Sequence, residues 1–437
     1  MSSTAIKSMS VATEATFASI DPTTGIPSAV GLIWSSAELA DDASVDIPGD
    51  PILTELTSGR AGIGRRPAEP ATLLSGGVPI QRRTGTVRAS VLLRPGMDGT
   101  PTSALWKLLR TLGVAILPPT LGGHSDVTIA PVDADSWTAT TSAKYADGAI
   151  VGFGLGGRWD YAGVEDVVGG IGVTPALQSN PGAGATARIL ATVGLPGVGL
   201  PAVGAVDTVA LDLRGDGWQA IAFGCAATQA VISVDATTRR ATLTIDYDSA
   251  HIAYQAAPAA PVQCVPSSGG TLAHQLQSYV KLGATHADDG TPDTLTGEVA
   301  TTLCLSALEL TLALTRAYGA CGSNITGRSY AEVTDATVSA VLTLGGVLNA
   351  PGSAAGVDAD LWRRYSRQVL IGFASGEPGT EHNGFAIWMP STCLTADPAK
   401  LDSGEPAYRQ VLTLGLSVPA ADSQGGILPA VAFGVGV

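Results

Sequence analysis

One stretch of the chain occurs twice, and this repeat constrains the fold more than any other feature of the sequence. The first copy reads TVRASVLL at residues 86–93, followed by a Gly/Pro-rich loop and ALWKLLR at residues 104–110. The second copy reads TVSAVLTL at residues 337–344, followed by a longer loop and DLWRRY at residues 360–365. Each copy predicts a strand, a loop and a short helix. Either the chain contains a duplicated domain, or two segments rich in Ala, Val and Leu agree by coincidence.

The two predicted helices begin with the same pair of residue types. Leu105 and Trp106 open the first helix, whose leucines fall on one face at helical spacing, and Leu361 and Trp362 open the second. Under the duplication these four side chains are equivalent core residues. We therefore expect both tryptophans to be buried between a helix and a sheet.

The composition favours β-structure. Hydrophobic residues make up 45% of the 437 residues, but aromatic residues only 5% and charged residues only 14%, so the core must consist of Val, Leu, Ile and Ala. Val and Thr favour strands, and 54 Gly with 27 Pro supply many turns. The low charge suits a surface that copies of the same chain cover, although a stable monomeric β-protein also fits.

The predicted domain organisation follows from length and from one linker. A chain of this length has room for two or three domains. Residues 256–270 (AAPAAPVQCVPSSGG) form the best linker candidate. We therefore predict a first β-domain at residues 1–255, with a long loop at 41–81, and a second β-domain at 271–437 with an uncharged apolar tail.

The elements expected in these domains are mostly short strands separated by turn residues, which indicates antiparallel β-domains. A helix is expected at residues 272–282, besides the two helices of the repeat. Further strands are expected at residues 10–20, 30–35, 126–131, 136–143, 149–153, 185–193, 208–213, 230–234, 241–247, 308–315, 385–389 and 408–418. The apolar tail at residues 426–437 would be a liability if free, so we expect it to be covered.

The long loop contains a cluster of basic residues in an otherwise acidic chain. These are Arg60, Arg65, Arg66, Arg82 and Arg83. A structureless loop of this length is usually functional or mobile. Two interpretations stay open: a solvated flexible loop, or a docking arm whose arginines contact an acidic surface of a neighbouring copy.

Charge and cysteine usage exclude several classes of function. The net charge of −14 argues against a nucleic-acid binder, because phosphate neutralisation needs a basic surface. The five cysteines form neither a metal-binding spacing nor a disulfide framework, which favours reduced thiols and assembly in the cytoplasm. No secretory signal is evident. The apolar run at residues 189–206 contains Pro196 and Pro201, so we interpret it as a loop or linker and expect no membrane span.

No motif in the chain predicts catalysis, a cofactor or a metal. Gly152, Gly154 and Gly157 match the dinucleotide pattern in letters, but the residues that follow do not have a helical pattern. Asp246 and Asp248 are too few for a calcium loop, because the later glycine and terminal glutamate are missing. We find no catalytic constellation.

The order of features at residues 8–117 resembles that of the phage (siphovirus-like) tail tube protein family. The opening SVATEATFA at residues 10–18, the long loop and the strand–loop–helix unit at 85–113 are similar to that family's layout, as is the segment from Tyr145 to Gly157. The resemblance covers most of the first domain but only the repeat unit and flanking strands of the second. It implies a β-sandwich with a flanking short helix, sheets that join between subunits around a lumen, and rings that stack through the long loop. No catalytic residues come with this family.

The leading functional prediction is therefore a duplicated tail tube protein that polymerises into a hollow channel for genome passage. Two domains in each chain predict a homotrimeric ring in place of a hexamer, with other tail proteins at the tube ends. Asp246 and Glu309 are expected to face the lumen, where acidic side chains repel DNA phosphates. Alternatives are another virion component, such as a tail terminator, a distal tail or hub protein or a capsid decoration protein, and a β-rich polysaccharide hydrolase.

Overall fold

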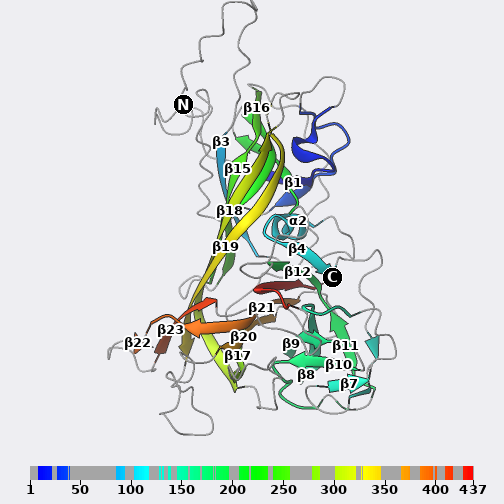
Figure 1. The fold of residues 1–437 in the computed structure, drawn as a ribbon, viewed down its shortest axis with the longest axis vertical. Helices are drawn as coiled ribbons and strands as arrows, with labels where there is room; N and C mark the ends of the chain where they lie inside the picture. The colour runs from blue at the N-terminus through cyan, green and yellow to red at the C-terminus, as the bar shows by residue number, and fades with distance from the viewer. Residues whose placement is uncertain are drawn as a thin grey trace, which may run out of the picture.

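The fold is mainly β, as predicted: the described residues contain one α-helix, one 3-10 helix and 24 strands. The structure is a computed structural model (Figure 1). It describes residues 8–21, 27–37, 39, 85–93, 103–117, 127–128, 130–131, 136–138, 145–155, 158–167, 170–180, 182, 184–195, 206–215, 218–234, 240–255, 278–285, 301–320, 326, 328–345, 366–374, 384–396, 399–400, 409–416 and 427–436.

Six strands from the second half of the chain close on themselves into a barrel. Around the barrel the antiparallel pairings run β17–β18–β19–β23–β21–β20 and return to β17. The interior is filled by buried aliphatic and aromatic side chains such as Val280, Ile371 and Phe385. The strands are β17 (Ser278–Thr285), β18 (Thr301–Ala320), β19 (Arg328–Gly345), β20 (Arg367–Ala374), β21 (Gly384–Leu394) and β23 (Arg409–Leu416), and the short β22 (Ala399–Lys400) pairs with β23.

One long strand of the first half, β14 (Trp218–Val234), takes part in two sheets. Its first part pairs with β13 (Val209–Gly215) and β16 (His251–Gln255). Its second part pairs with β15 (Ala241–Ser249) and with β18 of the second half. Gly224 lies at the change of partners with a φ of +61°, a conformation that favours glycine.

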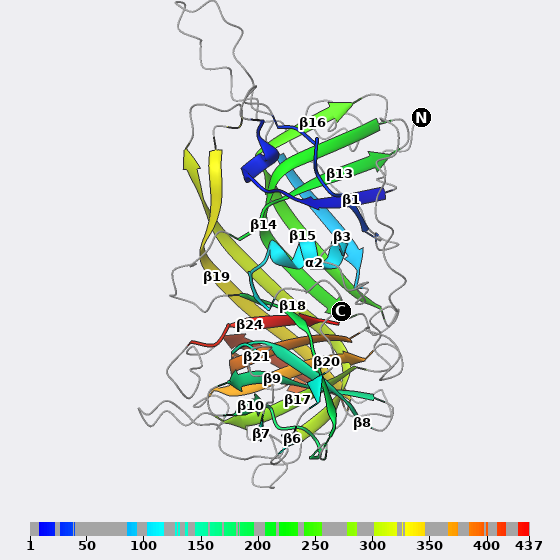
Figure 2. The same cartoon turned by 90° about the vertical axis from the view of Figure 1, so that its right-hand side faces the viewer.

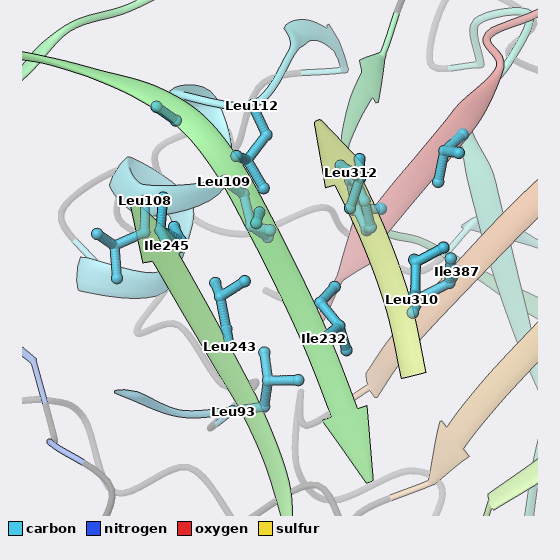
Figure 3. Packing of buried hydrophobic residues seen from close by; sticks show 14 of the residues in the cluster. Leu93, Leu108, Leu109, Leu112, Ile232, Leu243, Ile245, Leu310, Leu312 and Ile387 are labelled. Carbon is cyan, nitrogen blue, oxygen red and sulfur yellow. The ribbon is translucent and has the colours of Figure 1, made fainter. Parts of the chain in front are cut away.

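Strands β1, β2 and β3 and helix α2 of the first half complete a sandwich that contains β14. The strands β1 (Ser8–Thr13) and β2 (Ser35–Ala37) extend the sheet at β13, and β3 (Gly85–Leu92) pairs with β15. Helix α2 (Ala104–Arg110) packs its leucines into the same core, and Ser103 caps its N-terminus by accepting from the Trp106 amide. Figure 3 shows Leu108 and Leu109 of α2 near Ile245 and Leu243, which both belong to β15.

A second, seven-stranded sheet lies against the barrel (Figure 2). Its order is β5-β11-β8-β9-β10-β7-β6. Gly163 on β9 touches the ring of Trp388 on β21 so closely that a Cβ at this position would collide with it. The strands are β5 (Val127–Thr128), β6 (Ala130–Pro131), β7 (Ser136–Thr138), β8 (Ile150–Leu155), β9 (Arg158–Asp166), β10 (Ile171–Thr174) and β11 (Thr186–Ile189).

Strands of the two predicted domains are hydrogen-bonded to one another. Besides the β14–β18 pair, β12 (Ala191–Leu195) lies between β4 (Val114–Leu117) and the C-terminal β24 (Val431–Val435), which also pairs with β21. The division at residues 256–270 is therefore not a division between sheets. The tandem duplication stays a prediction, since Leu361 and Trp362 lie outside the described residues.

Several predicted elements are confirmed. The strand and the helix of the first repeat lie at β3 and α2, and Leu105 and Trp106 are buried there, as predicted. Every residue of β24 is buried between β12 and β21, so this part of the apolar tail is covered, and its cover comes from the same chain. Ile427, earlier in the tail, is 51% exposed.

Other predicted elements are wrong. Residues 278–282 form a strand in place of a helix, because β17 is hydrogen-bonded on both sides, to β18 and β20, and this pairing overrides the local spacing of apolar residues. The first strand ends at Thr13, and the 3-10 helix η1 (Phe17–Ser19) follows it. The apolar run at residues 189–206, interpreted as a loop, contains strand β12. No helix among the described residues has the length and apolar character of a membrane span.

A buried ion pair ties the seven-stranded sheet to the barrel. The Lys281 ammonium on β17 donates to Asp160 Oδ1 at 2.8 Å and to the Tyr161 carbonyl at 2.8 Å, and both charged side chains are 0% exposed. The other carboxylate oxygen of Asp160 accepts from the Gln178 amide at 2.9 Å. This arrangement offsets the cost of burying both charges.

Replacing Lys281 with Met should lower the free energy of unfolding by about 3–5 kcal/mol, because Asp160 would keep a buried charge without its cation. The double variant Lys281→Met/Asp160→Asn should recover part of that loss. The matched control is Arg88→Ala, whose ion pair with Asp246 is exposed and should be worth at most about 1 kcal/mol. Urea unfolding measures all three. A Lys281→Met variant as stable as the parent would contradict this account.

Candidate functional site

The strands β3-β15-β14-β18-β19 form a regular five-stranded sheet among the described residues. Its strands are in register, so that side chains form rows across the sheet. One row consists of Ala89, Ile245, Ala230, Leu312 and Val338, all of them buried. Because side chains alternate along a strand, the neighbouring rows point to the opposite face, which is exposed.

Side chains with hydroxyl groups dominate this opposite face, which we call the hydroxyl face. Ser233 and Thr242 share a hydrogen bond of 2.8 Å between β14 and β15, and the Thr244 hydroxyl donates to Ser90 at 3.0 Å. Short hydroxyl side chains paired in this way give a low, polar surface with little charge. The half-buried valine Val231 and the exposed Val341 lie in the same rows. The half-buried or exposed residues of this face that carry a hydroxyl group are Ser90, Ser233, Thr242, Thr244, Thr311, Ser339, Thr343 and Thr413.

The two acidic residues predicted to face a lumen both lie on the hydroxyl face. Asp246 on β15 is opposite Gln229 of β14, and Glu309 on β18 is opposite Ser233 of the same strand. Asp246 pairs with Arg88 at 3.5 Å, with both side chains partly exposed, and Glu309 is exposed. The structure thus places on one face of the sheet two carboxylates that lie far apart in the sequence.

Two edges of this sheet have little strand pairing in the described part of the chain. β23 pairs with β19 only from Ser339 onward, so residues 328–338 of β19 have a strand partner on one side alone. β3 pairs with β15 on one side, and on the other makes only the isolated bridge between Val91 and Leu39. Strand edges with an incomplete set of partners can pair with another strand.

Residues 328–338 of β19 belong to a long hairpin that extends past the end of the β14–β18 pairing. We call this hairpin the β18–β19 arm (residues 314–320 and 328–338). Figures 1 and 2 show it rising along the upper part of the molecule. Tyr330 near its tip is 51% exposed. The arm keeps its antiparallel pairing over this length, with register shifts between Thr315 and Arg316 and between Tyr318 and Ala320.

Two arginines fix the β18–β19 arm to the sandwich. Arg316 donates from Nε to the Ala227 carbonyl and from Nη2 to the Thr111 carbonyl, each at 2.7 Å. Burial lowers the pKa of Arg316 to about 10, so this group remains charged at neutral pH. Arg328 pairs with Asp248 at 3.0 Å, and its guanidinium lies 3.9 Å from the centre of the Tyr318 ring. The sequence analysis did not identify these residues.

The other predicted site residues fall into two groups. Leu105 and Trp106 are buried in α2, 7% and 6% exposed, and serve the core. The cluster Arg60, Arg65, Arg66, Arg82 and Arg83 lies outside the described residues, as do Leu361 and Trp362. Their roles stay predictions.

No described group of residues supports catalysis, cofactor binding or metal binding. Gly152 and Gly154 lie within strand β8, and strand β9 follows in place of the helix that a dinucleotide site needs. Asp246 and Asp248 lie on a strand, and the described residues contain no cluster of three or more potential metal ligands.

No protein-family model matches the chain, and no curated protein is detectably similar to it.

The assignment of the two faces predicts a large loss of stability at one residue of β18 and a small change at its neighbour. Leu310 is 0% exposed, so Leu310→Ala should cost about 2–5 kcal/mol of unfolding free energy. Glu309 is exposed, so Glu309→Ala should change it by no more than about 0.5 kcal/mol. Urea unfolding of both variants makes the comparison, and similar losses in the two would show that the faces are assigned incorrectly.

Proposed function

We propose that this chain is a structural virion protein that polymerises into stacked rings and so forms the hollow tail tube of a phage. The observation that carries the proposal is the hydroxyl face: a broad polar sheet surface, bordered by two weakly paired edges, on which Asp246 and Glu309 lie. The resemblance of residues 8–117 to the tail tube family supports it independently.

The two weakly paired edges belong to opposite sides of one sheet, and this allows a ring. In the order β3-β15-β14-β18-β19 every neighbouring pair is antiparallel, so β3 and β19 run in the same direction. A rotation about an axis roughly parallel to the strands therefore places β19 of one copy beside β3 of the next copy, and the two strands run in the same direction. Such a head-to-tail contact closes into a ring when the rotation is right, and it removes both edges.

In this ring the hydroxyl face lines the central channel, and its chemistry suits DNA passage. Duplex DNA binds surfaces that neutralise its phosphates with Lys and Arg. On the hydroxyl face the cation of Arg88 is already paired with Asp246, and Glu309 adds negative charge. Hydroxyl groups form hydrogen bonds that water replaces readily, so DNA slides past without being held.

The ring consists of three chains in this proposal, because the predicted tandem duplication would give each chain two tube-like halves. The covalent link between the halves reduces the number of chains that must be ordered in each ring. The arginine cluster of the loop at residues 41–81 contacts the adjacent ring. Other tail proteins cover the two ends of the tube, and assembly takes place in the host cytoplasm.

Electron microscopy of the purified chain should show rings or tubes, and native mass spectrometry should show a species of three chains. The control is a variant with Thr334→Lys and Thr337→Lys, which adds charge to the exposed side of the β18–β19 arm and should reduce ring formation without unfolding the chain. A monodisperse monomer at high concentration would contradict the proposal. Rings of six chains would contradict the trimer but leave the tube intact.

The position of the hydroxyl face in the ring is tested by the access of reagents to Glu309→Cys, in a background without the native cysteines. In assembled tubes a small maleimide should label this cysteine, whereas a maleimide carried on a folded protein should not reach it. The same variant kept unassembled is the matched control, and both reagents should label it because Glu309 is exposed on the single chain. Equal labelling of tubes by both reagents would place this face on the outside.

A further inference from the structure

The described part of the chain contains one buried carboxyl group that has no cation as its partner. Glu14 follows β1 and is 8% exposed. Its oxygens accept from the Thr208 hydroxyl at 2.8 Å, from the Gly224 amide at 3.1 Å and from the Ser19 hydroxyl at 3.3 Å. These partners come from the segment before β13, from β14 and from η1. A single side chain thus joins three elements.

The backbone around this carboxyl group is strained. Ala18 and Ser19 have φ values of 57° and 46°, although neither is a glycine. Gly224 has a φ of +61°, and a Cβ there would lie 2.8 Å from the Ala250 Cβ and 3.1 Å from the Ala18 Cβ. Backbone in this region persists only where its surroundings hold it. The hydrogen bonds of Glu14 are part of what holds the turn of residues 14–20 against the sandwich.

The charged and titratable groups on the elements packed against this turn leave Glu14 without a counter-ion. On β14 the nearest is the buried thiol of Cys225, whose pKa is raised by burial and then by the negative charges of Glu14 and Asp248. The other charged groups of these elements are engaged with partners of their own or exposed: Asp207 with Arg110, Asp212 with Arg214, Asp248 with Arg328, and the exposed Tyr330, Glu332 and Asp335 on β19. Two further titratable groups lie beside the turn, the buried His251 on β16 and the half-buried Asp21 after η1, and both have interactions of their own.

We propose that Glu14 is a proton-operated latch, which holds the turn of residues 14–20 closed while its carboxyl group is protonated and favours opening when the group ionises. In the closed, protonated form the acid donates to the oxygen of the Thr208 or Ser19 hydroxyl and still accepts from Gly224. On ionisation its proton leaves to solvent, and the anion gains water only if the turn opens. The proposal is independent of the tube assembly.

The direction of the effect follows from burial. Burial raises the pKa of Glu14 from its ordinary value of 4.5 to about 7, against smaller lowering contributions from the hydrogen bonds of Gly224, Thr208 and Ser19. A group whose pKa is raised in the closed state stabilises that state fully below pH 4.5, and the stabilisation is lost as the pH rises toward 7. Above that pH the loss is complete and opening no longer depends on pH.

Hydrogen exchange of the full chain, followed by mass spectrometry on peptides that cover residues 14–20, tests the latch. After correction for the intrinsic exchange rate, opening of this turn should increase about 70-fold between pH 5 and pH 8 and then level off. Peptides from β18 serve as the internal reference and should not follow this curve. Protection of the turn that does not change with pH would overturn the proposal.

Two variants connect the pH dependence to this carboxyl group. Glu14→Gln keeps the shape and an acceptor for Gly224 but cannot ionise, so its exchange curve should be flat. Thr208→Val removes a donor that favours the ionised form, so its curve should level off at a higher pH than that of the parent. The control Glu332→Gln changes an exposed carboxyl group and should leave the curve unchanged. If Glu14→Gln does not fold, an unshifted Thr208→Val curve still contradicts the latch.

Discussion

The backbone pairing of β14 is the constraint on which the rest of the structure depends. This strand is hydrogen-bonded to β13 and β16 through its first part and to β15 and β18 through its second. It therefore belongs to the sandwich of the first half and is also paired with the β18–β19 hairpin of the second half. Because buried backbone groups must find partners, no half of the chain satisfies its hydrogen bonds alone. The change of sheet at Gly224 needs a residue without a Cβ, which makes this one position decisive.

Buried charges then select one arrangement of the sheets from those that hydrophobic packing allows. Lys281 and Asp160 join the barrel to the seven-stranded sheet, while Arg316 joins β18 to the end of α2 and to β14. Displacing the partner of any of these groups would cost folding free energy, because a buried charge would lose its hydrogen bonds. A different docking of the sheets would leave a charge unpaired in the interior, so these contacts oppose alternatives more than they add stability.

The exposed hydroxyl face shows how a chain with few charges remains suited to water. Threonine has a high preference for strands and carries a polar group, so a face of Thr and Ser satisfies both the sheet and the solvent. Asp246 and Glu309 add charge without a basic surface. This combination is the physical basis of the proposed channel, and the weakly paired edges of β3 and β19 are the basis of the proposed ring.

The sequence by itself determined the fold class and the local elements with strong periodicity. The alternation in β18 and β19, the turn residues between strands and the leucines of α2 are local signals, so they predict where an element lies and which face is apolar. Residues 278–282 show where local signals are insufficient. Their spacing of apolar residues suggests a helix, and only hydrogen bonding to β18 and β20 makes them a strand. Tertiary structure alone decided that β14 joins the two halves, that the tail is covered by β12 and β21, and that Asp246 and Glu309 share a face. Strand partners are chosen by contacts between distant residues, and such contacts leave no periodic pattern in a single sequence. Burial of Glu14 and Lys281 follows from the same non-local packing, which is why neither was predicted.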